Sequence, residues 1–225
     1  MKTESRQDDI AILLANRTYL YRLLQNLFGN EPALETIQIL NNDHTQTSLT
    51  LLSLEDSLDL VRDFTEQLEK NKDAALDEVR TEYTRLFLGP TKLPAPPWES
   101  VYVSKERLLF QESTLEVRRC YLKYNYLPAR YRFEADDHLA LELDFMYNLS
   151  NLAEAAFQGE DLSEFREILK DQKIFLAEHL LVWVPQFAFD LESATTHSFY
   201  RGIVSLLKKY LKTDIEVIDE MLASL

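Results

Sequence analysis

The chain has 225 residues, of which 24 are lysine or arginine and 38 are aspartate or glutamate, giving a formal net charge of -14. This charge repels phosphate groups and argues against nucleic acid as a partner. The 46% of apolar residues indicates a folded globular protein and not a disordered one. The single cysteine, Cys120, excludes an internal disulfide and any multi-cysteine metal site, which fits a reducing cytoplasm.

The sequence also lacks the marks of a membrane or exported protein. No apolar run approaches the roughly 20 residues needed to span a bilayer, and Met1 to Asp9 contain no signal-peptide hydrophobic core. We therefore expect a cytoplasmic location and no stable membrane insertion. We also expect Cys120 to be a packed helical residue and not a nucleophile.

Helix-breaking residues are scarce, with only 4 glycines and 7 prolines, which predicts a mostly helical chain. Apolar residues at helical spacing predict, in chain order, helices over 10–28, from Pro32 onward, and over 54–68, 73–88, 135–157, 162–179 and 199–211. Cap-like sequences open helices at 113–116, 161–164 and 213–216, while 41–48 is expected to be a polar loop. The sequence therefore predicts an all-α fold, with about nine to eleven helices in a single compact domain over residues 1–225.

Four prolines fall within residues 90–97 and make one stretch stiff and non-helical. We expect a proline-rich loop at 89–103, where the domain has a possible soft division. The loop presents Trp98 and Tyr102, whose large apolar faces with a polar tip are typical of binding surfaces. A loop whose aromatic side chains cap the core is an equally good interpretation.

The most concentrated group of polar residues is Glu-Ala-Asp-Asp-His at 134–138. A carboxylate in this group can bind a cation, or orient the imidazole of His138 and hold it positive. Acidic residues also favour the first turn of a helix, where they complement the helix dipole, and the residues alone favour this plainer interpretation.

The sequence motifs of common enzymes are missing. There is no glycine-rich phosphate loop, no GxSxG and no HExxH, and the four histidines do not have metal-ligand spacing. We therefore expect a protein that is not an enzyme, with no catalytic residues, no metal and no cofactor.

The run RLFLGPTKLPAPPWESVY at 85–102 resembles the signature of the TorD/DmsD/NarJ family of redox-enzyme maturation chaperones, and most closely its DmsD-like members. Similar pieces follow in order at 105–110, 113–115, 137–138, 179–187 and 199–201, so the resemblance spans roughly residues 10 to 212. It implies an all-helical cytoplasmic chaperone that binds the twin-arginine signal peptide of a molybdopterin-containing oxidoreductase. Such a chaperone holds back export of this precursor until the cofactor is inserted, and the family includes monomers and domain-swapped dimers.

The resemblance also implies which residues bind the peptide. By motif, these are Tyr83, Leu86, Phe87, Pro97, Trp98, Asp137 and His138. The chemistry of a basic and apolar peptide adds Tyr102 to an apolar groove. It makes the carboxylates of Glu99, Glu134, Asp136 or Asp137 the candidates to pair with arginines. Relatives often carry proline where this chain has Ala135, so the entry to the following helix is less rigid here.

Three other functions remain open on the sequence. The chaperone could recognise a client's N-terminal peptide that lacks an export signal, or the chain could be a general helical interaction module. A nucleotide hydrolase acting on GTP is the third, although no phosphate loop is present. Whether the proline–tryptophan loop and the Asp-His motif lie together in space cannot be read from the sequence.

Overall fold

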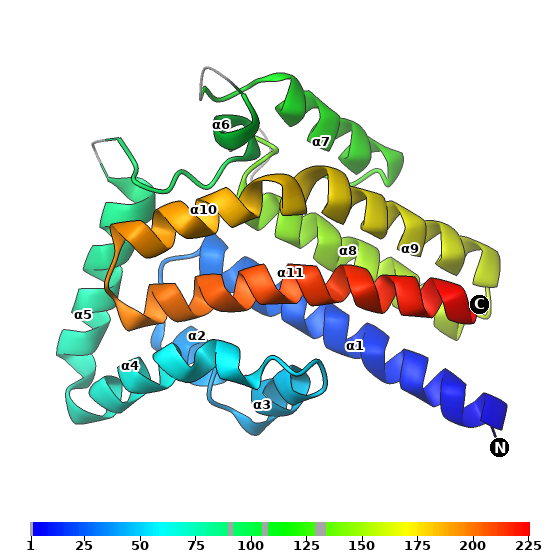
Figure 1. Ribbon diagram of the computed structural model, residues 1–225, viewed down its shortest axis with the longest axis horizontal. Coiled ribbons are helices and arrows are strands. Elements are labelled where there is room, and N and C mark those ends of the chain that lie inside the picture. The colour runs from blue at the N-terminus through cyan, green and yellow to red at the C-terminus, as the bar shows by residue number, and fades with distance from the viewer. Residues whose placement is uncertain (1, 90–91, 105–107, 129–133) are drawn as a thin grey trace.

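A computed structural model describes residues 2–89, 92–104, 108–128 and 134–225, which form helices joined by loops (Figure 1). The helices of the first half are α1 (Lys2–Gly29), α2 (Leu34–Ile39), α3 (Asp43–Thr50), η1 (Glu55–Leu58), α4 (Asp59–Lys70), α5 (Lys72–Tyr83) and η2 (Thr84–Leu88). Those of the second half are α6 (Glu99–Val103), α7 (Glu112–Lys123), α8 (Leu139–Gln158), α9 (Leu162–Phe175), η3 (Leu176–Leu180), α10 (Leu181–Ala194) and α11 (Ser198–Ser224). The predicted all-α class is confirmed for these residues.

Two predicted boundaries are wrong. Residues 41–48 are not a loop, because Asn42 caps α3: its side chain accepts a hydrogen bond from the Thr45 amide at 2.7 Å, which satisfies one of the unpaired donors at the helix start. The cap-like sequence at 213–216 does not open a new helix either. α11 runs through it without a break, because the Asp214 side chain points into the core instead of capping a helix.

Smaller differences occur at other helix ends. α7 begins at Glu112, with Gln111 before it, so the box-like sequence at 113–116 lies inside the helix. α8 begins at Leu139, a turn later than predicted, and His138 is its N-cap. Asp161 does cap α9, as predicted, by accepting from the Glu164 amide at 2.9 Å.

The core lies among the long helices. α1 packs along α8, and α11 packs against α4, α9 and α10 (Figure 1). α11 and α4 approach closely at Gly202, where a Cβ atom would come within 2.5 Å of Val61 Cγ2. Only glycine therefore permits this packing distance. The first and second halves of the chain are thus in contact along much of their length.

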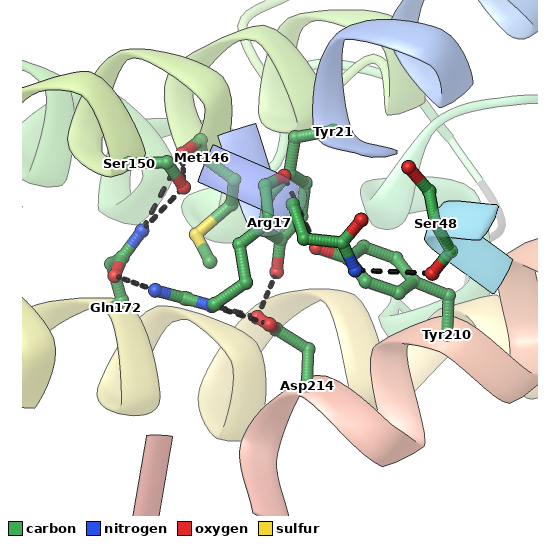
Figure 2. A network of polar contacts seen from close by, with 9 residues as sticks. Arg17, Tyr21, Ser48, Met146, Ser150, Gln172, Tyr210 and Asp214 are labelled. Carbon is green, nitrogen blue, oxygen red and sulfur yellow. Dashed lines mark hydrogen bonds and ion pairs between the residues drawn. The ribbon is translucent and has the colours of Figure 1, made fainter. Parts of the chain in front are cut away.

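A buried polar network crosses this core (Figure 2). The Arg17 guanidinium on α1 donates to both carboxylate oxygens of Asp214 on α11, at 2.5 and 3.0 Å, and to Gln172 of α9 at 3.0 Å. The Tyr21 hydroxyl donates to the same carboxylate at 2.6 Å. Burial lowers the pKa of Arg17, but the adjacent Asp214 outweighs it and the pKa is raised. One buried cation therefore ties three helices together.

The helical stretch Leu162–Ala194 is long and apolar enough to span a membrane by composition. Half of its apolar window is buried inside the protein, and it contributes core residues such as Trp183 and Phe187. It therefore has the packing expected of a core helix. Its middle is a π-helical turn, η3, which carries His179.

Candidate functional site

The proline–tryptophan loop and the Asp-His motif lie together in the structure. Trp98 and His138 form an antiparallel bridge, in which the Glu99 amide donates to the Asp137 carbonyl at 3.0 Å and the Leu139 amide donates to the Pro97 carbonyl at 2.9 Å. The rings of Trp98 and His138 meet edge to face, with centroids 5.4 Å apart. Two short backbone segments distant in sequence thus form one rigid junction.

The polar tips at this junction are oriented by hydrogen bonds. Trp98 Nε1 donates to the Glu134 carboxylate at 2.9 Å. His138 Nδ1 accepts from the Ala140 amide at 3.1 Å and so caps α8. A neutral His138 ring therefore carries its proton on Nε2. The motif does precede a helix, but Asp136 and Asp137 lie before its first turn and not in it, and the capping group is the imidazole and not a carboxylate.

Asp136 and Asp137 both point inward. The Asp137 carboxylate accepts from the Ser100 amide at 2.8 Å and thereby caps the short helix α6. The Asp136 carboxylate pairs with Arg118 at 2.5 Å. Both side chains are almost fully buried, so in this conformation they position the junction and do not face solvent.

Glu99 is also buried, inside a group of titratable side chains that sequence reasoning did not bring together. It accepts from His179 Nδ1 at 3.0 Å. The charge of Glu99 acts on the neighbouring Glu142, whose Oε2 accepts from Trp183 Nε1 at 3.1 Å. Burial, and then the charges of Glu99 and Asp137, raise the pKa of Glu142. Burial and these neighbouring charges therefore disfavour the ionised form of Glu142.

For the imidazole of His179, burial and the neighbouring groups shift the pKa in opposite directions. Burial lowers its pKa, but hydrogen bonds with Cys120 and Glu99 outweigh burial and raise the pKa to about 9. Cys120 Sγ lies 3.8 Å from His179 Nε2. The chain thus carries a buried carboxylate–imidazolium pair directly after Trp98. The spacing of His179 and Trp183, one helical turn apart, was the only sequence signal for this group.

The aromatic side chains of the candidate site fall into two places. Tyr102 stacks on Trp183, with centroids 5.5 Å apart, next to the Glu142 group. Tyr83, Leu86 and Phe87 are buried, and Phe87 packs against Tyr200 of α11 at 6.0 Å. These three residues therefore support the core, and Leu86, with no exposed surface, does not line an open groove in this conformation.

A polar pocket of about 270 Å³ adjoins the junction. Its lining residues come from α1, the 134–138 turn and α8: Arg22, Gln25, Asn26, Gly29, Asn30, Glu134, His138, Ala140, Leu141 and Asp144. Two carboxylates, Glu134 and Asp144, face one cation, Arg22, whose Nη1 lies 3.6 Å from Asp144. The pocket therefore has spare negative charge and room for a cationic side chain. Pro97, by contrast, is buried behind it.

A larger cavity of about 540 Å³ lies elsewhere, between α4, α5 and the start of α11. Three carboxylates, Asp77, Glu78 and Glu82, and the ring of His197 line it. It shares no residue with the Trp98 junction. Among the described residues, no group of three or more His, Cys, Asp or Glu side chains is arranged to hold a metal ion.

Comparison with known proteins identifies relatives along most of the chain. The family model described as "Nitrate reductase delta subunit" matches residues 53–188. The chain is 32% identical over 204 residues to the chaperone protein TorD of Aliivibrio salmonicida, covering 89% of this chain and 93% of that protein. It is 29% identical over 216 residues to the chaperone protein TorD of Vibrio cholerae, covering 95% and 96%. A solved structure from Archaeoglobus fulgidus, described as a candidate redox enzyme maturation protein, is 22% identical with a TM-score of 0.47, covering 87% of this chain and 93% of that chain.

Proposed function

Because the chain belongs to the nitrate reductase delta subunit family, with TorD chaperones among its relatives, we propose that it binds the twin-arginine signal peptide of its client. The protein is a maturation chaperone for a molybdoenzyme and not an enzyme itself. We propose further that it works in the cytoplasm and holds back export of the precursor until the cofactor is inserted. A monomer or a domain-swapped dimer is the expected assembly.

The polar pocket beside Trp98 is the observation that carries this proposal. Glu134 and Asp144 offer carboxylate oxygens to a guanidinium, which can donate two parallel hydrogen bonds to a carboxylate in a planar pair. Arg22 already lies near Asp144, but at 3.6 Å on a half-exposed side chain its ion pair is loose. An incoming arginine with better geometry displaces it at little cost.

Trp98 contacts two residues that line the pocket, Glu134 and His138. Its indole is partly exposed, and its Nε1 holds the Glu134 carboxylate in place. Arginine stacks readily on aromatic faces, so one guanidinium can lie over the indole while it pairs with Glu134. Under this proposal Glu99, Asp136 and Asp137 position the junction, and Tyr83, Leu86, Phe87, Pro97 and Tyr102 support it from the core.

A calorimetric titration tests the proposal. The probe is a synthetic peptide with two adjacent arginines followed by an apolar segment, compared with the same peptide carrying glutamines in place of the arginines. We expect the wild-type protein to bind the arginine peptide at least ten-fold more tightly, and Trp98→Ala to weaken that binding about ten-fold, or ~1.4 kcal/mol. Phe189→Ala, which removes an exposed aromatic ring from α10, away from the pocket, is the control.

Two results would count against it. If the wild-type protein binds both peptides equally, the arginines are not recognised, and a client peptide without an export signal becomes the better candidate. If Trp98→Ala and Phe189→Ala both bind like the wild type, the peptide lies elsewhere on the protein. Asp137→Ala is a poor probe, because it removes the cap of α6 as well as a charge.

A further inference from the structure

The surface of α7 carries apolar side chains that the chain itself leaves uncovered. Leu115 and Leu122, two helical turns apart, are 44% and 66% exposed, and Leu127 after the helix is 65% exposed. Leu122 and Leu127 line a small depression of about 60 Å³, together with Arg118, Tyr121, Tyr126, Pro128 and Asp136. Single exposed leucines are ordinary, but two that line one depression, with a third two helical turns away on the same helix, suggest a contact surface.

Three cations near these leucines pair with carboxylates of the same chain. Arg118 pairs with Asp136 at 2.5 Å, and Arg119 pairs with Glu112 at 2.9 Å. Lys123, one residue after Leu122, pairs with Asp171 at 2.5 Å. The cations beside Leu122 are therefore compensated within the chain, so this part of the α7 surface suits an uncharged apolar segment.

This surface shares a wall with the polar pocket beside Trp98. The Tyr126 hydroxyl donates to the Asp144 carboxylate; Tyr126 lines the depression and Asp144 lines the pocket. The 134–138 turn also lies between the two sites, because Asp136 lines the depression and Glu134 lines the pocket. An acidic site and an apolar site thus lie back to back.

We propose that the α7 leucines bind the apolar segment that follows the arginine pair in the same peptide. This inference rests on the proposed function and names where the second half of the ligand lies. The two halves of the peptide match the two neighbouring sites in charge. The basic half would lie against the carboxylates of the pocket, and the uncharged apolar half would lie against the α7 leucines. Leu115 and Leu122 are separated by about 10 Å along the helix, which spans two turns of a docked apolar helix.

The double variant Leu122→Gln with Leu127→Gln tests this placement without changing the charge. Leu162→Gln, on a 52% exposed leucine of α9, is the matched control. Fluorescence anisotropy measures binding of two labelled peptides. Both carry the arginine pair; one continues with a dozen apolar residues, and the other with serine and glutamine. We expect the double variant to bind the apolar peptide at least ten-fold more weakly than the wild type, and the polar peptide within two-fold of it.

The controls separate this inference from the proposed function. If the wild type prefers the apolar peptide and the double variant binds it within two-fold of the wild type, the apolar segment docks elsewhere and the inference is overturned. Equal wild-type affinity for the two peptides overturns it as well. Loss of discrimination between the arginine peptide and its glutamine counterpart would instead refute the proposed function.

Discussion

His179 donates to Glu99 at 3.0 Å inside the protein, and this buried pair joins the π-helical turn η3 to the helix that directly follows Trp98. The pair is shielded from solvent, and its partners Glu142 and Trp183 extend the contact to α8 and α10. The orientation of the candidate site therefore depends on a protonation state.

The raised pKa of His179 predicts a pH-dependent stability. Its pKa is about 9 in the folded protein and about 6.5 in an unfolded chain. The contribution is therefore fully present below about pH 6.5 and is lost as the pH rises through 9. Urea unfolding of the wild type and of His179→Asn should differ by on the order of 1–3 kcal/mol at pH 6 and converge above pH 9. A constant difference across this range would contradict the assignment.

Glu142 makes a separate prediction. Burial first, and then Glu99 and Asp137, raise its pKa above the ordinary value, so its ionisation destabilises the folded state as the pH rises. Glu142→Gln keeps a neutral oxygen to accept from Trp183 and should unfold at a higher urea concentration than the wild type at pH 8. Glu142→Ala leaves the indole N–H unpaired and should lose about 1–3 kcal/mol. Equal midpoints for the wild type and the glutamine variant would show that the carboxyl carries no such cost.

The Arg17–Asp214 pair predicts the largest loss of stability. Asp214→Asn removes the anion that compensates a fully buried guanidinium (Figure 2), so we expect a loss of about 3–5 kcal/mol in the free energy of unfolding. Asp56→Asn breaks an exposed pair with Lys209 at 2.9 Å and should cost less than about 1 kcal/mol. Similar losses for the two variants would mean that the buried network is not tightly coupled.

Contacts across the proline-rich loop predict one cooperative unit. Tyr200 donates to the Val79 carbonyl at 2.6 Å, and Arg85 donates to the Ala194 carbonyl at 2.8 Å. We therefore propose a single domain without an independent division at 89–103. Hydrogen exchange in increasing urea should show α1 and α5 opening at the same concentration as α9 and α11. Two well-separated transitions would establish the division instead.

The fold could largely be predicted from the sequence because apolar spacing and the scarcity of breakers are local signals. One of the two wrong boundaries came from a long-range contact. Residues 213–216 have the pattern of a cap, but Asp214 is fixed by Arg17, which lies 197 positions away. The other is local: Asn42 lies in a polar stretch typical of a loop, but its side chain caps α3 by accepting from the amide of Thr45.

The candidate site was only partly predictable, because contacts between segments distant in sequence assemble it. Trp98 and His138 are each conspicuous, but two backbone hydrogen bonds between distant segments bring them together. The apolar and aromatic residues that end the helix before the loop predict a groove at Leu86 and Phe87, but both side chains are buried in the core. The exposed apolar surface lies on α7, whose leucines are interspersed with charged residues and so give no clear sequence signal.

The central claim is that the pocket carboxylate Glu134 pairs with an arginine of the signal peptide. A double-mutant cycle tests it directly, with wild-type protein, Glu134→Gln and the control Glu78→Gln, which removes the same charge from the separate acidic cavity. Each is titrated with the twin-arginine peptide and with its glutamine counterpart. We expect a coupling of about 1–3 kcal/mol for Glu134 and less than about 0.5 kcal/mol for Glu78. Equal coupling for both positions would mean that the peptide senses only the net charge, and the pocket would not be its binding site.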